Sequence, residues 1–506
     1  MWKALPSQWT EWIAKLLTLV EEQGKWPNDC CQAYVTVIPK GETGDKPSDY
    51  RPITVMDVVY RIWAKGVVED WKGTLRDTML SPTAMGFRSG HGTLHLAQFI
   101  QDVMRYQKKS KKPLWLVSFD IAKCYDTIPW WAIFGTMRTA GIPERIVQCF
   151  KSMYGQMERW FKYGGVEGSK WTATNGLAQG CPASPDILNL LYEAFHRWAH
   201  SRGLGIPLSF GAESLTVPAA SYADDMTLMA DSRQNLDVLI QAFLKWCRLL
   251  GLVVNVKKTQ VWTSTKIKSA PIEGVQVETR RTFRVVGIEL GIKEIETTKA
   301  HLEKRLERAH MALKRLKTMG VPSSVANDVV TMSILPMVTY GCELRHLRPS
   351  HVDRIAKEAR KVVLDRNPLY LCGFRATEVV SSWPLGCHAV KSPMEFVWEK
   401  QLKWAQLLGN MSQLTGWLHR GLATQNGSGT WNEPSPCLNR ALKQFGATIT
   451  VNQESAMIHR WPSLHAEPTF RGETRLFLYE EHPAPPFDAV FTDGSLKDGV
   501  GGAAVW

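Results

Sequence analysis

Two adjacent carboxylates inside an apolar, alternating stretch constrain this chain more than any other feature. The stretch SYADDMTLMA runs from Ser221 to Ala230 and places Asp224 and Asp225 between residues that alternate as they do in β-strands. Because aspartate tolerates the backbone of a tight turn, this stretch and the preceding VPAA predict a β-hairpin with Asp224-Asp225 at its tip. The fold must therefore hold two like charges side by side at one end of a sheet.

A third acidic residue is expected at the same edge. The stretch LWLVSFDIAKCYD predicts a buried strand that carries Asp120 at its end. If this strand pairs beside the hairpin, three carboxylates meet and repel one another. Oxygen ligands of this kind suit Mg²⁺, and two such ions about 4 Å apart would relieve the repulsion. The pattern indicates a site for two divalent cations, with an ordinary polar turn as the alternative.

Composition limits the class of protein and of partner. The 506 residues include 61 Lys and Arg against 48 Asp and Glu, which leaves a net charge of +13. This length accommodates about three domains, and the excess positive charge favours nucleic acid or an acidic membrane surface as the partner. No run approaches the roughly 18 apolar residues of a membrane span, and the N-terminal stretch does not resemble a signal peptide. We therefore expect an intracellular protein with no membrane partner.

The stretch from Thr297 to Gly320 predicts a long amphipathic helix. Its apolar residues follow one another at spacings of four and three, which gives a single buried stripe. The other faces carry basic side chains, among them Arg305, Arg308 and Arg315. We expect these three residues to contact nucleic-acid phosphates, and a solvated helix surface is an equally good interpretation.

Several further motifs occur in a fixed order along the chain. They are YRPI (50–53), GFRSGHGT (86–93), FDIAKCYD (119–126), GLAQGCPASP (176–185), YADD (222–225), GLVVNVKKT (251–259) and FRVVGIEL (283–290). In this order they resemble the fingers, palm and primer-grip motifs of reverse transcriptases from non-LTR (LINE-type) retrotransposons. Val286 stands where that family usually has Leu, and the resemblance covers about residues 15 to 365.

The resemblance implies an α+β fold of the right-hand polymerase type, with fingers, palm and thumb. The expected parts are an N-terminal helical extension (1–32), fingers and palm (33–290), a helical thumb (291–366) and a helical connector (367–486). Residues 487–506 resemble the first hairpin of a ribonuclease H domain, with Asp493 at the position of its first metal-binding aspartate. The later ligands of that domain are missing, so we expect an incomplete site in a fragment of a longer polyprotein. An ordinary acidic strand end is the alternative for Asp493.

The resemblance also implies which residues hold the metal ions and the nucleotide phosphates. Asp120 and Asp224 would hold two Mg²⁺ ions, or Mn²⁺, and Asp225 would complete the acidic cluster in a lesser role. Lys40 and Arg51 would neutralise the triphosphate of the incoming dNTP, with surface ion pairs as the alternative.

Three further residues would act on the sugar, the base and the leaving group. Tyr125 would block a ribose 2′-hydroxyl, with core packing as its alternative role, and Gln179 would lie beside the nascent base pair. Lys258 would protonate the leaving pyrophosphate, although the adjacent Lys257 is an open alternative.

The leading hypothesis is therefore an RNA-directed DNA polymerase of a non-LTR retroelement that adds dNTPs to a primer 3′-hydroxyl. Its partners would be an RNA template, a DNA primer and target DNA, and its location would be nuclear. The alternatives are an inactive nucleic-acid-binding protein or splicing-type cofactor on the same scaffold, and a DNA-templated polymerase. The basic run KKSKK (108–112) fits a nuclear signal, although a solvated loop is the favoured interpretation.

Overall fold

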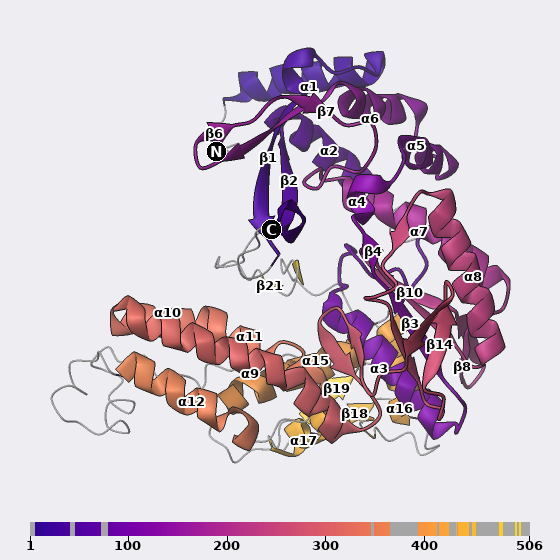
Figure 1. Cartoon of the computed structure of the whole chain (residues 1–506), viewed down its shortest axis with the longest axis vertical. Coiled ribbons are helices and arrows are strands. Elements are labelled where there is room, and N and C mark those ends of the chain that lie inside the picture. The colour runs from indigo at the N-terminus through magenta and orange to yellow at the C-terminus, as the bar shows by residue number, and fades with distance from the viewer. Residues whose placement is uncertain are drawn as a thin grey trace.

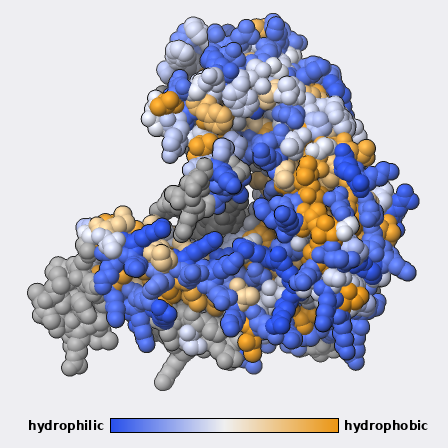
Figure 2. Space-filling view, in the orientation of Figure 1, coloured by the Kyte–Doolittle hydropathy of each residue, from blue (hydrophilic) through white to orange (hydrophobic). Residues whose placement is uncertain are grey.

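The fold is a mixture of helices and antiparallel and parallel strands, as expected for the α+β class. The computed structural model describes residues 6–40, 46–71, 79–345, 349–364, 393–411, 414–424, 432, 434–444, 448–451, 475–478, 491–492 and 495–496. Figure 1 shows an arch of three lobes, which we call the N-terminal, central and helical lobes. Figure 2 shows a hollow between the N-terminal and helical lobes, with the central lobe on its right side.

The N-terminal lobe is built on a small sheet. Its strands are β1 (Gln32–Pro39), β2 (Tyr50–Met56), β5 (Glu158–Tyr163), β6 (Val166–Glu167) and β7 (Trp171–Thr172). Strand β1 pairs antiparallel with β2 and parallel with β5. The accompanying helices are α1 (Ser7–Gln23), α2 (Val58–Trp71), α5 (Trp130–Thr139) and α6 (Glu144–Gln156). Buried rings of Trp26, Tyr60, Trp63 and Phe150 contact one another here, so an aromatic core supports the β1–β2 ladder.

The central lobe holds a four-stranded antiparallel sheet in the order β10-β11-β3-β13. The strands are β10 (Ala219–Tyr222), β11 (Asp225–Ala230), β3 (Trp115–Phe119) and β13 (Gln260–Thr263). Side chains of β3 alternate between two apolar clusters: Val117 and Phe119 belong to one, and Leu116 to the other. Both faces of β3 are therefore covered, which explains why every residue of the strand except Ser118 is apolar. The flanking helices are α3 (Thr93–Lys109), α7 (Ser184–Ser201) and α8 (Arg233–Leu249).

Short elements accompany these two sheets. They are β4 (Ile121–Ala122) with β12 (Val253–Val254), α4 (Cys124–Thr127), β8 (Ile206–Phe210) with β9 (Glu213–Val217), β14 (Ser269–Ile272) with β15 (Val275–Glu278), and β16 (Phe283–Val285) with β17 (Ile288–Leu290). The β16–β17 hairpin leads directly into the helical lobe.

The helical lobe begins with the long helix that the sequence predicts. Its helices are α9 (Glu294–Met319), α10 (Ser323–Val329), α11 (Leu335–Thr339) and α12 (Pro349–Leu364). Leu302, Ala309 and Leu313 of α9 are buried against α10–α12, which confirms the predicted apolar stripe. Gly320 ends α9 in the left-handed conformation, with φ of 74°.

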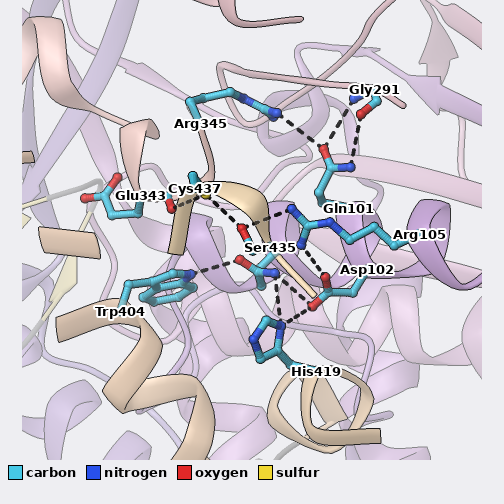
Figure 3. A network of polar contacts seen from close by, with 11 residues as sticks. Gln101, Asp102, Arg105, Gly291, Glu343, Arg345, Trp404, His419, Ser435 and Cys437 are labelled. Carbon is cyan, nitrogen blue, oxygen red and sulfur yellow. Dashed lines mark hydrogen bonds and ion pairs between the residues drawn. The ribbon is translucent and has the colours of Figure 1, made fainter. Parts of the chain in front are cut away.

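Three later helices pack close to α3 of the central lobe. They are α15 (Pro393–Asn410), α16 (Leu414–Thr424) and α17 (Pro436–Gln444). Figure 3 shows the buried polar network between them, with Asp102 of α3 at its centre. The Asp102 carboxylate accepts from His419 at 2.9 Å, from Arg105 at 2.7 Å and from Gln98 at 2.8 Å. Burial alone would raise the pKa of Asp102, but these partners outweigh it and lower that pKa.

The C-terminal part contributes two further strand pairs. Strand β18 (Thr448–Val451) runs parallel to β19 (Arg475–Leu478), and β20 (Phe491–Thr492) pairs antiparallel with β21 (Ser495–Leu496). Asp493 lies outside the described residues, so its predicted role stays a prediction. None of the helices that the structure describes is long and apolar enough to cross a membrane.

Candidate active site

The acidic hairpin forms as predicted, but its turn lies one residue earlier. Tyr222 pairs with Asp225, so the two turn residues are Ala223 and Asp224, and Asp225 begins β11. The expectation that Asp225 shares the tip is therefore corrected. The left-handed position of this turn, with φ of 54°, belongs to Ala223 and not to an aspartate. A positive φ at the first turn residue matches the twist of hairpin strands, which explains why the turn forms there.

The sheet register brings the third carboxylate to the same place. Met226 of β11 pairs with Phe119 of β3, so the next step along the ladder sets Asp225 beside Asp120. Asp120 lies between β3 and β4, and its carbonyl oxygen accepts from the backbone of Asn255 at 2.8 Å. The structure thus places all three predicted carboxylates at one edge of the sheet.

One ammonium group lies against this cluster. The turn after β12 hydrogen-bonds Lys258 N to the Asn255 carbonyl at 3.0 Å, and Lys258 Nζ lies 3.5 Å from Asp120 Oδ2. The Lys258 side chain is 68% exposed and that of Asp120 is 39% exposed, so solvent screens the pair and it contributes little to stability. Of the two lysine candidates, Lys258 is the one with an ion pair to the acidic cluster.

Burial and mutual repulsion raise the pKa values of both hairpin carboxyl groups. Burial raises the pKa of Asp224, repulsion by Asp120 adds to this rise, and attraction by Arg51 opposes it. Burial, followed by repulsion from Asp224 and Asp120, raises the pKa of Asp225 to about 7. The surroundings of Asp224 and Asp225 therefore favour a cation beside these two carboxyl groups.

The donor set suits a hard divalent cation in an open site. Among the residues that the structure describes, no three or more His, Cys, Asp or Glu side chains are arranged to hold a metal ion. Mg²⁺ usually binds through one or two protein carboxylates and completes its shell with water and substrate phosphates. Asp120 and Asp224 fit this mode, since both supply oxygen donors that repel each other without a cation.

The two predicted phosphate-binding residues share one end of the β1–β2 ladder. Arg51 pairs with Ile38, and two residues later Lys40 N donates to the Asp49 carbonyl at 2.8 Å. Both side chains are exposed. Arg51 acts on Asp224 across the space between the two lobes, because its charge lowers the pKa of that carboxyl. This end of the ladder points towards the helical lobe (Figure 1).

The loop that holds Gln179 and Gly180 contacts both β2 of this ladder and α4. Gln179 accepts from Thr54 N through its carbonyl at 2.7 Å and donates from Nε2 to Asp126 Oδ1 at 3.0 Å. Gly180 has φ of 127°, and a Cβ there would lie 2.2 Å from the Thr54 carbonyl oxygen. Tyr125 is half-buried on α4, and its carbonyl accepts from Leu177 N at 2.6 Å. Tyr125 and Gln179 are thus held together between β2 and the carboxylates.

Asp126 is a site residue that sequence reasoning missed. It follows Tyr125 within the FDIAKCYD motif, and its carboxylate orients the Gln179 amide. The only sequence feature that pointed to Asp126 was its place in the motif. No neighbouring residue indicates that its partner is Gln179, 53 residues away.

The structure corrects one of the three predicted arginines of α9. Arg305 donates to the carbonyls of Met337 at 3.1 Å and Gly287 at 2.9 Å, and its guanidinium lies 4.8 Å from the Tyr340 ring centroid. Burial lowers the pKa of Arg305. Its guanidinium therefore joins the helical lobe to the β16–β17 hairpin and does not face phosphates. Arg308 and Arg315 are exposed, as predicted.

Comparisons with known proteins extend over the part of the chain that carries this site. Residues 38–290, half of the chain, match the family model described as reverse transcriptase (RNA-dependent DNA polymerase). The type-2 retrotransposable element R2DM Pol polyprotein of Drosophila melanogaster is 25% identical over 280 residues, which cover 55% of this chain and 25% of that protein. A type-1 element R2 Pol polyprotein of Popillia japonica is 23% identical over 353 residues, or 67% of this chain and 48% of that protein.

Two further similarities are to a transposon protein and to a solved structure. The transposon TX1 149 kDa protein of Xenopus laevis is 24% identical over 223 residues, which cover 44% of this chain and 17% of that protein. The solved telomerase of Candida tropicalis with a fragment of telomeric RNA is 13% identical, with a TM-score of 0.38, and the match covers 81% of this chain and 68% of that one.

The chain spans less than half the length of each of these three retroelement relatives. The family match ends at residue 290, so the ribonuclease H resemblance of residues 487–506 stays a prediction. The match nevertheless includes every carboxylate and lysine of the acidic cluster. The chain belongs to the reverse transcriptase (RNA-dependent DNA polymerase) family and is related to the Pol proteins of non-LTR retrotransposons.

Proposed function

We propose that this protein is an RNA-directed DNA polymerase of a non-LTR retroelement, which extends a primer 3′-hydroxyl with dNTPs. The observation that carries the proposal is the meeting of Asp120, Asp224 and Asp225 at one sheet edge, where burial and mutual repulsion raise the pKa values of Asp224 and Asp225. Holding like charges together is costly, and a scaffold that only binds nucleic acid gains nothing from it. In this proposal the N-terminal, central and helical lobes act as fingers, palm and thumb.

In this proposal each side chain has a role that follows from its position in the site. Asp120 and Asp224 hold the divalent cations, which, when bound, neutralise the triphosphate and favour attack by the 3′-hydroxyl. Arg51 and Lys40 bind triphosphate oxygens from the end of the β1–β2 ladder. Lys258, already beside Asp120, donates a proton to the leaving pyrophosphate.

The nucleotide sugar and base are placed by the loop and α4. Tyr125 stands where a ribose 2′-hydroxyl would lie, and Gln179 contacts the base pair being formed, with its amide fixed by Asp126. The proposed partners are an RNA template, a DNA primer, target DNA and dNTPs, and the exposed Arg308 and Arg315 contact the phosphates of the template and primer.

Primer extension by the purified chain tests this function. One labelled DNA primer is annealed to RNA and DNA templates of the same sequence, with Mg²⁺ or Mn²⁺ and four dNTPs. Extension on RNA supports the proposal. Extension on DNA alone would identify a DNA-templated polymerase, and binding without extension on either template would identify an inactive nucleic-acid-binding protein.

A further inference from the structure

An exposed aromatic residue lies in a strained conformation beside the acidic hairpin. Phe87 has φ of 58°, a region that bulky side chains rarely adopt, and its side chain is 38% exposed. Its ring centroid lies 6.4 Å from that of Tyr222, two residues before Asp224, with the ring planes inclined by 32°. Neither solvent exposure nor this backbone conformation favours phenylalanine, so its presence needs another explanation.

The backbone on either side of Phe87 is braced against the hairpin. Met85 N donates to the Ser221 carbonyl at 2.9 Å, and Ser221 N donates to the Thr83 carbonyl at 2.9 Å. Asn189 Nδ2 donates to the Gly86 carbonyl at 2.7 Å. A Cβ at Gly86 would lie only 2.4 Å from Ala223 N, so the two backbones touch. The position of Phe87 relative to Asp224 is therefore fixed.

Strained backbone gathers around this site. The described residues include six non-glycine positions with positive φ, and three of these besides Phe87 belong to segments that form the site. Ala223 precedes Asp224, Lys123 follows Asp120 by three residues, and Val286 is a turn residue of the β16–β17 hairpin. Such strain persists where the surroundings enforce it and is typical of functional sites. Phe87 is the one aromatic residue among these six.

The neighbours of Phe87 belong to a different apolar cluster from the residues of the proposed nucleotide pocket. Tyr125, Leu177 and Ala178 of that pocket contact one apolar cluster. Met85 and Tyr222, next to Phe87, belong to the other cluster, which Val286 also contacts. The Tyr340 hydroxyl, 2.9 Å from both Thr93 Oγ1 and the Val286 carbonyl oxygen, ties the start of α3 to that hairpin. The ring that Phe87 contacts, Tyr222, thus belongs to the cluster that extends to the β16–β17 hairpin and the helical lobe. The strand being extended must end on this side if the dNTP enters from the N-terminal lobe.

We propose that Phe87 is a positioning residue whose ring packs against the 3′-terminal nucleotide of the primer. An uncharged ring can stack on any base or sugar face, which suits an enzyme that must extend every primer sequence. Held rigidly beside Asp224, the ring limits the positions of the 3′-hydroxyl relative to the carboxylates. This inference rests on the proposed function only in naming the bound strand as a primer.

Phe87→Gly separates this role from a structural one. Glycine adopts φ of 58° without strain, so this variant keeps or gains thermal stability while it loses the ring. A 2-aminopurine at the primer 3′ end reports stacking through its fluorescence, and Asp224→Asn in both proteins removes any effect of turnover. We expect the change in 2-aminopurine fluorescence that the protein with Phe87 produces on binding to be lost in Phe87→Gly. The same fluorescence change should return in Phe87→Trp. Primer–template affinity should fall by about fivefold or more.

Steady-state extension gives a second readout. Phe87→Gly should raise KM for primer–template and lower the rate of extension, while KM for dNTP stays within about twofold of the wild-type value. Trp131→Ala, which removes a 65% exposed ring on α5, is the control and should change none of these values. An unchanged 2-aminopurine signal in Phe87→Gly, or a rise in KM for dNTP alone, would overturn the inference. If the wild type binds the primer end but extends no template, the proposed function fails while the stacking result still decides the role of Phe87.

Discussion

Tyr125 and Lys258 show how single side chains acquire roles from their backbone setting. The backbone carbonyl of Tyr125 accepts a hydrogen bond from Leu177 N, which holds the backbone that carries the ring. The Tyr125 side chain is half-buried. Lys258 owes its place beside Asp120 to the turn that hydrogen-bonds it to Asn255. Each residue also has a purely structural alternative role, which is core packing for the tyrosine and a surface ion pair for the lysine. Each alternative role predicts a different experimental result.

Tyr125→Val should make the enzyme accept ribonucleotides. If the ring blocks a 2′-hydroxyl, the clash amounts to about 3 to 5 kcal/mol, or about 10² to 10³-fold in kcat/KM discrimination. The measurement is dNTP against rNTP incorporation on one template, with thermal unfolding in parallel. A destabilised variant with unchanged sugar preference would instead identify a packing residue, because truncating a buried aromatic costs about 3 to 5 kcal/mol.

Lys258→Met should slow nucleotide addition by about 10² to 10³-fold, because it removes the proposed proton donor. Lys257→Met is a matched control, since it removes the same charge from the adjacent exposed position. Single-turnover extension rates of the two variants provide the comparison. Equal rates for the two variants would remove Lys258 from the mechanism.

At the scale of an element, α9 combines two kinds of arginine. Arg305 follows the buried Leu302 by three residues, so both side chains lie on the helix face that packs against the rest of the lobe. From this face Arg305 donates to the carbonyls of Met337 and Gly287. Arg308 and Arg315 lie on exposed faces. Helical periodicity predicted this helix and its stripe, yet it did not show that one basic side chain would point into the interface between lobes.

Reversing the charge of both Arg308 and Arg315 to Glu should weaken primer–template binding and flatten its salt dependence. The log–log slope should fall by about two, or one for each lost phosphate contact. Arg305→Ala should leave the slope unchanged and lower the free energy of unfolding by about 1 to 3 kcal/mol, because two carbonyls lose a charged donor. Binding titrations at several salt concentrations and urea unfolding distinguish these effects. An unchanged slope in the double variant would place this face of α9 away from nucleic acid.

The order and type of the main elements follow from the sequence, whereas contacts between distant segments do not. The hairpin and its carboxylates could be predicted from the sequence because alternation and turn chemistry are local. The observed turn nevertheless begins one residue earlier than predicted, at Ala223. Asp126 and the bracing of Phe87 were not visible, because their partners lie far away along the chain. Arg51 acts on Asp224 only once the lobes are assembled.

At the scale of the whole molecule, a buried network ties α3 to helices more than 300 residues later. Asp102 and His419, separated by 317 residues, are both fully buried and joined at 2.9 Å. Trp404 donates to Gln98 at 3.0 Å, and Arg345 donates to Gln101 at 3.4 Å (Figure 3). The C-terminal helices are thus part of the same folded body as the acidic site.

Asp102→Asn should destabilise the protein by about 3 to 5 kcal/mol, because it leaves Arg105 and His419 without their buried carboxylate. Because the pKa of Asp102 is lowered in the folded state, its contribution is present at neutral pH and is lost only as the pH falls below the ordinary aspartate range. Urea unfolding at pH 7 measures the difference. Asp237→Asn, which weakens a partly exposed pair with Arg233, is the control and should cost less than about 1 kcal/mol. Equal effects of the two changes would refute the role of the network.

The most direct test of the proposed polymerase centre compares Asp224→Asn with Asp237→Asn in the same purified protein. Both remove one negative charge from the central lobe, but only Asp224 belongs to the acidic cluster. We predict that Asp224→Asn lowers the rate of primer extension on an RNA template by about 10³-fold or more, with primer–template affinity nearly unchanged. Asp237→Asn should extend at the wild-type rate. Substantial extension by Asp224→Asn would contradict the assignment of these carboxylates as the centre of a polymerase.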